Sequence, residues 1–153
     1  MNAHHFRKLE RMYLSAPINQ FFRPELRIEH GRAEVRIPIR RELFHAAHAA
    51  HGSVYFKAAD DAAFFAVNSL VEDVFVLTTQ IDLHLFRPIA EGTLLARAVV
   101  VHAARASFLA EAVLTDDQDR QVARAVATFV RGRTPLGEEI GYRLDPEPVH
   151  PPT

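Results

Sequence analysis

The sequence predicts an α+β domain in which one antiparallel sheet curls around a single long helix. Two patterns predict this arrangement: a helix start meets a long apolar run in residues 51–69, and four strand-like runs follow with no further helix between them. The helix is apolar around most of its circumference but carries charged side chains, so it has to be enclosed by protein and not by a membrane.

The central helix is expected over roughly 16 residues, from Val54 to Leu70, because this run contains neither Gly nor Pro. Ser53 precedes it and is a favourable N-cap residue. At about 100° per residue, one stripe along the helix is more polar than the apolar remainder. That stripe contains Ser53, Lys57, Asp61, Phe64 and Asn68.

The chain ahead of the central helix is expected to form a short helix and a hairpin. Apolar residues recur at helical spacing in residues 4–14, and Pro17 ends that region. Apolar and charged residues alternate through residues 26–39, which indicates half-buried strands joined by a turn at Gly31. Pro38 places the end or the edge of a sheet there, because proline cannot donate to a strand ladder.

The chain after the central helix is expected to form an antiparallel meander. Residues 40–52 form an irregular segment leading into the helix, and turn signals such as Pro88 with Gly92 separate the strands that follow it. A very short link near Ala104 and Arg105 implies antiparallel neighbours. The four predicted strands span residues 74–86, 93–104, 106–115 and 121–131.

Length and composition favour one globular domain. The 153 residues, of which 48% are apolar, can bury a good core. We expect an N-terminal helical segment over residues 1–20, the domain over residues 21–133, and an extended or disordered tail over residues 134–153. That tail holds five of the nine prolines.

Charge and cysteine content exclude several classes of function. The net charge of −1 has both signs scattered along the chain, so neither a nucleic-acid stripe nor a basic membrane patch is expected. The absence of cysteine excludes disulfides, thiolate catalysis and cysteine-bound zinc. The first residues do not resemble a secretion signal, so a cytoplasmic protein is expected.

The sequence HGSVYFKAADDAAFFAVNS, residues 51–69, resembles the helix motif of the PaaI-like (phenylacetyl-CoA type) hot-dog thioesterases. The similarity continues in LFRPIAEGTLLARAVVVHAAR and in DDQDRQVARAVATF, and covers residues 25–131. It implies the hot-dog fold and hydrolysis of an acyl-CoA thioester without a cofactor. It also implies Asp60 as the catalytic carboxylate. Two positions depart from the motif: Ser53 replaces its second glycine, and His45 stands where related enzymes often carry Asn.

The chemistry of the residues points to the same groups. A helix start supplies free amide donors and partial positive charge, and Gly52 leaves its N–H open to a ligand, so it is the expected oxyanion-hole donor. Asp61 lies one turn beyond Lys57 on the polar stripe, where an exposed ion pair contributes little. Asp60 lies beside apolar rows, where partial desolvation raises its basicity, and is therefore the expected base or nucleophile.

Further residues are expected near the substrate. His51 either orients the loop or contacts the thioester directly, and both roles are compatible. Strand-end arginines could meet the phosphates of coenzyme A, although only one or two of them are expected to do so. No metal is expected, although His45, His48 and His51 recur every third residue. The predicted substrate-binding residues are His45, Ser53, Phe64, Arg87 and Arg105.

The resemblance also implies assembly and leaves two other functions open. Hot-dog proteins of this kind pair two protomers edge to edge, so we expect a dimer or a dimer of dimers that combines His51 and Gly52 of one chain with Asp60 of the other. Gln80, Asp82 and His84 face either solvent or a second interface. The alternatives are an acyl-CoA-binding or sensor protein without turnover and an enoyl-CoA hydratase.

Overall fold

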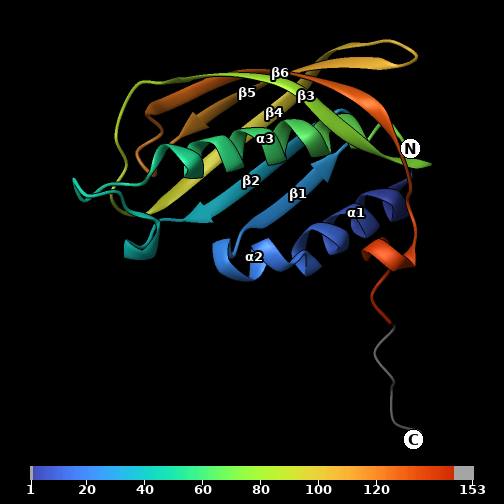
Figure 1. Ribbon diagram of the computed structural model, residues 1–153, viewed down its shortest axis with the longest axis horizontal. Coiled ribbons are helices and arrows are strands. Elements are labelled where there is room, and N and C mark those ends of the chain that lie inside the picture. The colour runs from blue at the N-terminus through green and yellow to red at the C-terminus, as the bar shows by residue number, and fades with distance from the viewer. Residues whose placement is uncertain (1, 147–153) are drawn as a thin grey trace, which may run out of the picture.

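The computed structural model describes residues 2–146 and shows a curved six-stranded antiparallel sheet that encloses one long helix (Figure 1). This is the predicted hot-dog arrangement. The helix, α3, spans Gly52–Asn68. The strands are β1 (Glu25–Glu29), β2 (Arg32–Pro38), β3 (Val74–Leu85), β4 (Thr93–Ala103), β5 (Ser107–Thr115) and β6 (Gln121–Pro135). Their order in the sheet is β1-β2-β4-β5-β6-β3.

Small side chains let α3 lie close to the sheet. Ala58, Ala59, Ala62 and Ala66 of α3 are fully buried, and long strand side chains such as Phe129 of β6 fill the space around them. The helix therefore forms the centre of the hydrophobic core. Among the described residues, no helix combines the length and apolarity that crossing a membrane requires.

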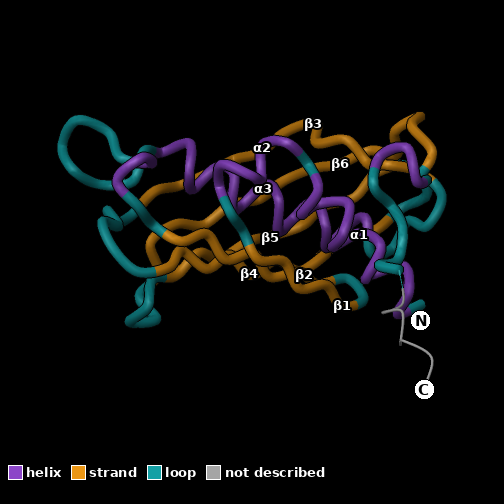
Figure 2. The backbone as a smooth tube through the Cα atoms, turned by 90° about the horizontal axis from the view of Figure 1, so that it is seen from below, coloured by secondary structure: helices purple, strands orange, loops and turns teal. Residues whose placement is uncertain are grey.

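Two further helices lie on the same side of the sheet as α3 (Figure 2). The predicted first helix is present as α1, Ala3–Ser15, whose buried residues face the core. Pro17 does more than end that region, because it also begins a second helix, α2, at Pro17–Phe22. Proline suits a first helical position, where its missing N–H leaves no bond unmade and its φ is already helical.

The prediction of an extended or disordered tail is wrong for its first part. The last strand, β6, continues to Pro135, and a 3-10 helix, η2, follows at Glu138–Ile140. Proline content misled the prediction because Leu136, Ile140 and Tyr142 pack against the core and hold this segment in place. Residues 147–153 of the predicted tail lie outside the described residues.

One edge of the sheet is apolar and open. Within the described part of the chain, β3 pairs only with β6, so its other edge has no neighbour. Large apolar side chains are exposed beside this edge: Phe56 of α3 is 43% exposed, Leu85 of β3 is 51% exposed, and the adjoining Phe86 is 58% exposed. Exposed apolar surface next to an open strand edge is characteristic of a protein interface.

Candidate active site

The start of α3 is held by the imidazole of His51. Its Nδ1 accepts a hydrogen bond from the Ser53 N–H at 3.0 Å and lies 2.9 Å from Ser53 Oγ. This arrangement places the proton of a neutral His51 on Nε2. The prediction of Ser53 as the N-cap is wrong, because the helix begins at Gly52 and the ring nitrogen of His51 supplies the capping acceptor.

Gly52 is the first residue of α3, and its amide has no acceptor in the part of the chain that the structure describes. Within the described residues, the N–H groups of Ser53 and Val54 both bond to His51, whereas the Gly52 N–H bonds to nothing. A Cβ on Gly52 would lie 3.5 Å from Leu85 Cδ1, which is an ordinary contact. Packing therefore does not require glycine at this position. The free donor and the helix dipole together make this a favourable place for a developing negative charge.

Asp60 lies two turns further along α3, beside β3. The Thr78 hydroxyl donates to Asp60 Oδ1 at 2.8 Å, and within the described residues Oδ2 has no protein partner. Burial raises the pKa of the Asp60 carboxyl above its usual 3.8, and the Thr78 hydrogen bond lowers it by less. The result is an oriented carboxylate with one free oxygen and enhanced basicity.

Asp61 belongs to a different polar cluster, which joins α1 to α3. Its Oδ2 accepts from Tyr13 of α1 at 2.5 Å and from Lys57 at 2.6 Å. The expected exposed pair is instead largely enclosed, since the Lys57 and Asp61 side chains are only 10% and 18% exposed. The pair is enclosed because α1 and α2 cover this part of α3. They place the Tyr13 and Phe22 rings beside the Lys57 ammonium group.

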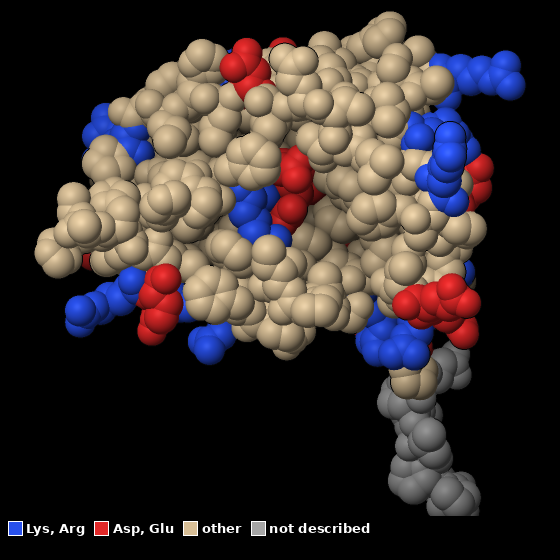
Figure 3. Space-filling view, in the orientation of Figure 1, with Lys and Arg blue, Asp and Glu red and all other residues tan. Residues whose placement is uncertain are grey.

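A cavity of about 750 Å³ lies between α3, β3 and α1–α2 and contains both carboxylates. Figure 3 shows a hollow in this face of the molecule, with acidic and basic atoms side by side within a mostly uncharged rim. Lys57, Asp60 and Asp61 line the cavity, and Phe64, Phe65 and Phe75 supply aromatic walls. Its size and largely apolar lining are those of a small-molecule site.

One chain does not bring Gly52 and Asp60 together. They are eight residues apart on one helix, which corresponds to about 12 Å along its axis. Both groups therefore cannot contact the same carbonyl within a single chain.

Among the predicted substrate-binding residues, Phe64 lines the cavity. Its ring packs against those of Phe65 and Phe75, with centroids 4.9 and 4.8 Å away. Ser53 is exposed at the start of α3, and His45 is exposed in the preceding loop, where its Nδ1 accepts from the Ala47 N–H at 3.0 Å. Neither Ser53 nor His45 borders the cavity.

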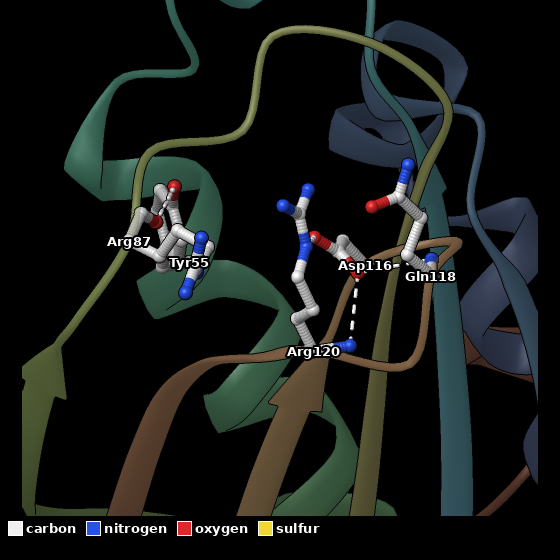
Figure 4. Close-up of polar contacts among 5 residues, drawn as sticks. All are labelled: Tyr55, Arg87, Asp116, Gln118 and Arg120. Carbon is white, nitrogen blue, oxygen red and sulfur yellow. Dashed lines mark hydrogen bonds and ion pairs between the residues drawn. The ribbon is translucent and has the colours of Figure 1, made fainter.

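The two predicted arginines lie at opposite ends of the sheet. The register places Arg87, which follows β3, at the end where α3 begins, and Arg105, in the β4–β5 turn, at the other end. Both side chains are exposed. Figure 4 shows the Tyr55 hydroxyl of α3 meeting the backbone carbonyl of Arg87, at 2.9 Å. In the same view, Arg120 of the β5–β6 turn is paired with Asp116.

The three loop histidines do not form a metal site. In residues 2–146, no three His, Asp or Glu side chains come together where they could hold a metal ion. His48 lies at a positive φ of 64° in the loop, and His51 is used as the helix cap.

Two residues of the site are absent from the sequence-based prediction. Thr78 was placed in a strand, but its contact with Asp60 depends on how α3 lies against β3, which no periodicity reports. Tyr13 is one of the residues that recur at helical spacing in residues 4–14, and this spacing does not reveal the partner of its hydroxyl group. Both contacts join residues far apart in the sequence, and only the tertiary fold defines them.

Known proteins support the class that this fold and site suggest. The model of the Thioesterase superfamily matches residues 48–123, which include α3 and the strands β3, β4 and β5. No curated protein matches the chain. The fold is that of the hot-dog proteins, and the chain is similar to the Thioesterase superfamily over about half of its length.

Solved structures share this fold at low sequence identity. The PaaI protein of the Escherichia coli phenylacetic acid degradation operon has a TM-score of 0.79 at 20% identity, covering 86% of this chain and 96% of that one. The conserved protein PA5202 of Pseudomonas aeruginosa has a TM-score of 0.74 at 26% identity, covering 80% and 98%. The thioesterase HI1161 of Haemophilus influenzae has a TM-score of 0.72 at 16% identity, covering 78% and 85%.

Proposed function

We propose that the protein is an acyl-CoA thioesterase in which Asp60 is the catalytic carboxylate. The observation that carries this proposal is the position of Asp60: it borders a cavity of about 750 Å³, and Thr78 holds one of its oxygens. Burial raises the pKa of its carboxyl group, which makes the carboxylate a better base. A carboxylate placed in this way has no structural partner other than Thr78 among the described residues.

We propose that the complete site forms between two copies of the chain. Asp60 of one subunit would face Gly52 of the partner subunit, because the two groups are too far apart within one chain. The open edge of β3 and the apolar side chains beside it support pairing between two β3 strands. Oligomers of this kind are related by a two-fold axis, so one dimer would contain two equivalent sites.

The shared site constrains where the two-fold axis passes. If Gly52 of each subunit meets Asp60 of the other, the axis passes between the two α3 helices, beside the midpoint of this stretch, which is Phe56. Phe56 is 43% exposed in the single chain. A large exposed aromatic residue at this position supports the proposed axis, since it would be buried against its own copy.

The proposed reaction adds water across the thioester. The carbonyl oxygen becomes negative as the carbon is attacked, and the Gly52 N–H at the helix start stabilises that charge. The carbon–sulfur bond then breaks, releasing a free acid and coenzyme A. Asp60 either takes a proton from the attacking water or attacks the carbon itself. In the second route coenzyme A leaves first, and water then hydrolyses the mixed anhydride on Asp60 to give the free acid. Oxygen-18 from solvent enters the enzyme carboxylate during a single turnover only in the second route.

The test is release of free thiol from a panel of acyl-CoAs by wild type and Asp60→Asn. We expect Asp60→Asn to retain the fold and lose at least about 100-fold in kcat, because an amide is neither base nor nucleophile. Asp82→Asn is the matched control, since the Asp82 side chain is 72% exposed on β3. Equal rates for wild type and Asp60→Asn, or acyl-CoA binding without turnover by wild type, would contradict the proposal and favour a sensor.

A further inference from the structure

More than half of the residues that line the cavity come from two segments outside the superfamily match. One segment is Met12–Asn19, from α1 and α2, and the other is Thr134–Gly141, from the end of β6 and η2. The remaining lining residues belong to α3 and β3. These two segments therefore form the part of the cavity wall that lies outside the match to the superfamily.

The two segments fit tightly against each other. A Cβ on Gly141 would lie 2.5 Å from Ser15 Oγ and 3.4 Å from Met12 Cα, and Gly141 has a φ of +86°. The backbone conformation therefore favours glycine there, and a Cβ would also displace the Ser15 hydroxyl. The two segments therefore meet at residues that border the cavity.

Hydrogen bonds fix the wall formed by α1 and the chain around η2 to α3. His5 of α1 is 1% exposed, and its Nε2 donates to the carbonyl of Asn68, at the end of α3, at 2.8 Å. Its Nδ1 then accepts from the hydroxyl of Tyr142 at 2.7 Å. Together with the bond from Tyr13 to Asp61, these contacts join both segments to the helix that carries Asp60. The wall is a packed part of the fold.

The cavity extends from the carboxylate along β3. Asp60 bonds to Thr78, and three residues back along β3 is Phe75, which borders the cavity beside Thr134. Three residues of strand correspond to about 10 Å. Met12 and Ile140 border the same cavity.

We propose that these two segments, Met12–Asn19 and Thr134–Gly141, set an upper limit to the length of the acyl group. An acyl chain with its thioester at Asp60 would run along Phe64 and Phe75 and end against Met12 and Ile140. The site thus selects apolar acyl groups of medium length and rejects long chains. This inference rests on the proposed function, and it assigns specificity to residues that have no part in the chemistry.

Binding of non-hydrolysable S-alkyl-CoA thioethers with four to sixteen carbons tests the inference without turnover. We expect the affinity of wild type to rise with chain length, about fourfold for each methylene buried, and to fall once the chain exceeds the cavity. Ile140→Ala and Met12→Ala should move the optimum to longer chains. Leu144→Ala is the matched control, because Leu144 is 42% exposed and does not line the cavity.

A further variant tests the inference without changing any residue that lines the cavity. Tyr142→Phe changes no lining residue but removes the hydroxyl that bonds to His5, so it should broaden the chain-length profile while a melting curve shows a folded protein. The inference is overturned if wild type binds sixteen-carbon chains as tightly as eight-carbon chains, or if all variants keep the wild-type optimum. Failure of the proposed function looks different: the thioethers would bind with a length limit, but no acyl-CoA would be hydrolysed.

Discussion

At the scale of single residues, the site depends on how Asp60 is held. Burial and a hydrogen bond act on its carboxyl group in opposite directions: burial raises the pKa and the Thr78 hydroxyl lowers it. The carboxylate must be ionised to act as a base or nucleophile. Activity should therefore rise as the pH increases through the pKa of Asp60, which lies above the usual 3.8.

The first prediction concerns Thr78→Val. Without the hydroxyl, the pKa of Asp60 rises further, because the bond that favours the ionised form is gone. The acid limb of the kcat/KM profile should move to higher pH, and kcat should fall about 10-fold as the carboxylate loses its orientation. Thr78→Ser keeps the hydroxyl and is the control. An acid limb that stays in place in Thr78→Val would show that Thr78 does not tune Asp60.

The second prediction separates the effect of the Gly52 N–H on activity from the effect of adding a side chain at this position. Gly52→Pro removes the donor, and proline is tolerated at the first position of a helix. The preceding His51 already has φ −60° and ψ 146°, the conformation that a following proline favours. We expect kcat to fall about 100- to 1,000-fold with little change in melting temperature.

Gly52→Ala is the matched control for this change. It retains the N–H, and its Cβ would make only an ordinary contact with Leu85 Cδ1, at 3.5 Å. Activity near the wild-type level is expected. If both variants lose activity equally, the side-chain position matters and the amide does not.

At the scale of elements, the end of α3 is tied to the start of β3 through Asn68. This fully buried side chain donates to the carbonyls of Val71 and Val74 and accepts from the N–H of Val76, at 3.0, 3.2 and 3.1 Å. These three bonds set the position of β3 relative to α3. That position in turn brings Thr78 to Asp60.

The third prediction is that Asn68→Ala lowers the free energy of unfolding by about 2 to 4 kcal/mol, because it leaves three backbone groups unpaired in the core. Urea denaturation measures the change. Gln80→Ala, at an exposed position of β3, should stay within about 0.5 kcal/mol of wild type. A loss below 1 kcal/mol for Asn68→Ala would mean that water or a small shift satisfies these groups.

The sequence predicts the helices and strands of this fold better than it predicts the contacts between them. The uninterrupted run after residue 51 and the alternation in residues 26–39 predict α3 and the first hairpin, because each pattern reports which face of one element is buried. The capping role of His51 was missed since histidine is an unusual cap. Asp60 and Gly52 stood out through their motif, but Thr78 could not, since its role follows from the relative placement of two elements.

At the scale of the whole molecule, the single chain has an open β3 edge. In the proposed dimer Gly52 and Asp60 meet across two subunits, and Phe56 lies between them on α3. An isolated chain is therefore expected to fold but to have no activity.

The fourth prediction is complementation between two inactive variants. Asp60→Asn and Gly52→Pro are each inactive as homodimers, but a mixed dimer has one site with both an intact Asp60 and an intact Gly52. Unfolding and refolding the two together at equal amounts should restore about a quarter of wild-type activity, since half of the dimers are mixed and each has one working site. Refolding each variant alone is the control. No recovery from a mixture shown to contain mixed dimers would contradict a site shared by Gly52 and Asp60.

The bond between His5 and Tyr142 joins positions 137 residues apart in the sequence. During synthesis α1 emerges early. The hydrogen bond from Tyr142 to the buried imidazole of His5 can form only after almost the entire remaining chain has been made. The far wall of the cavity is therefore among the last features to assemble. Until then a nascent chain can have its central helix and most of its strands in place while the pocket is still open at one end.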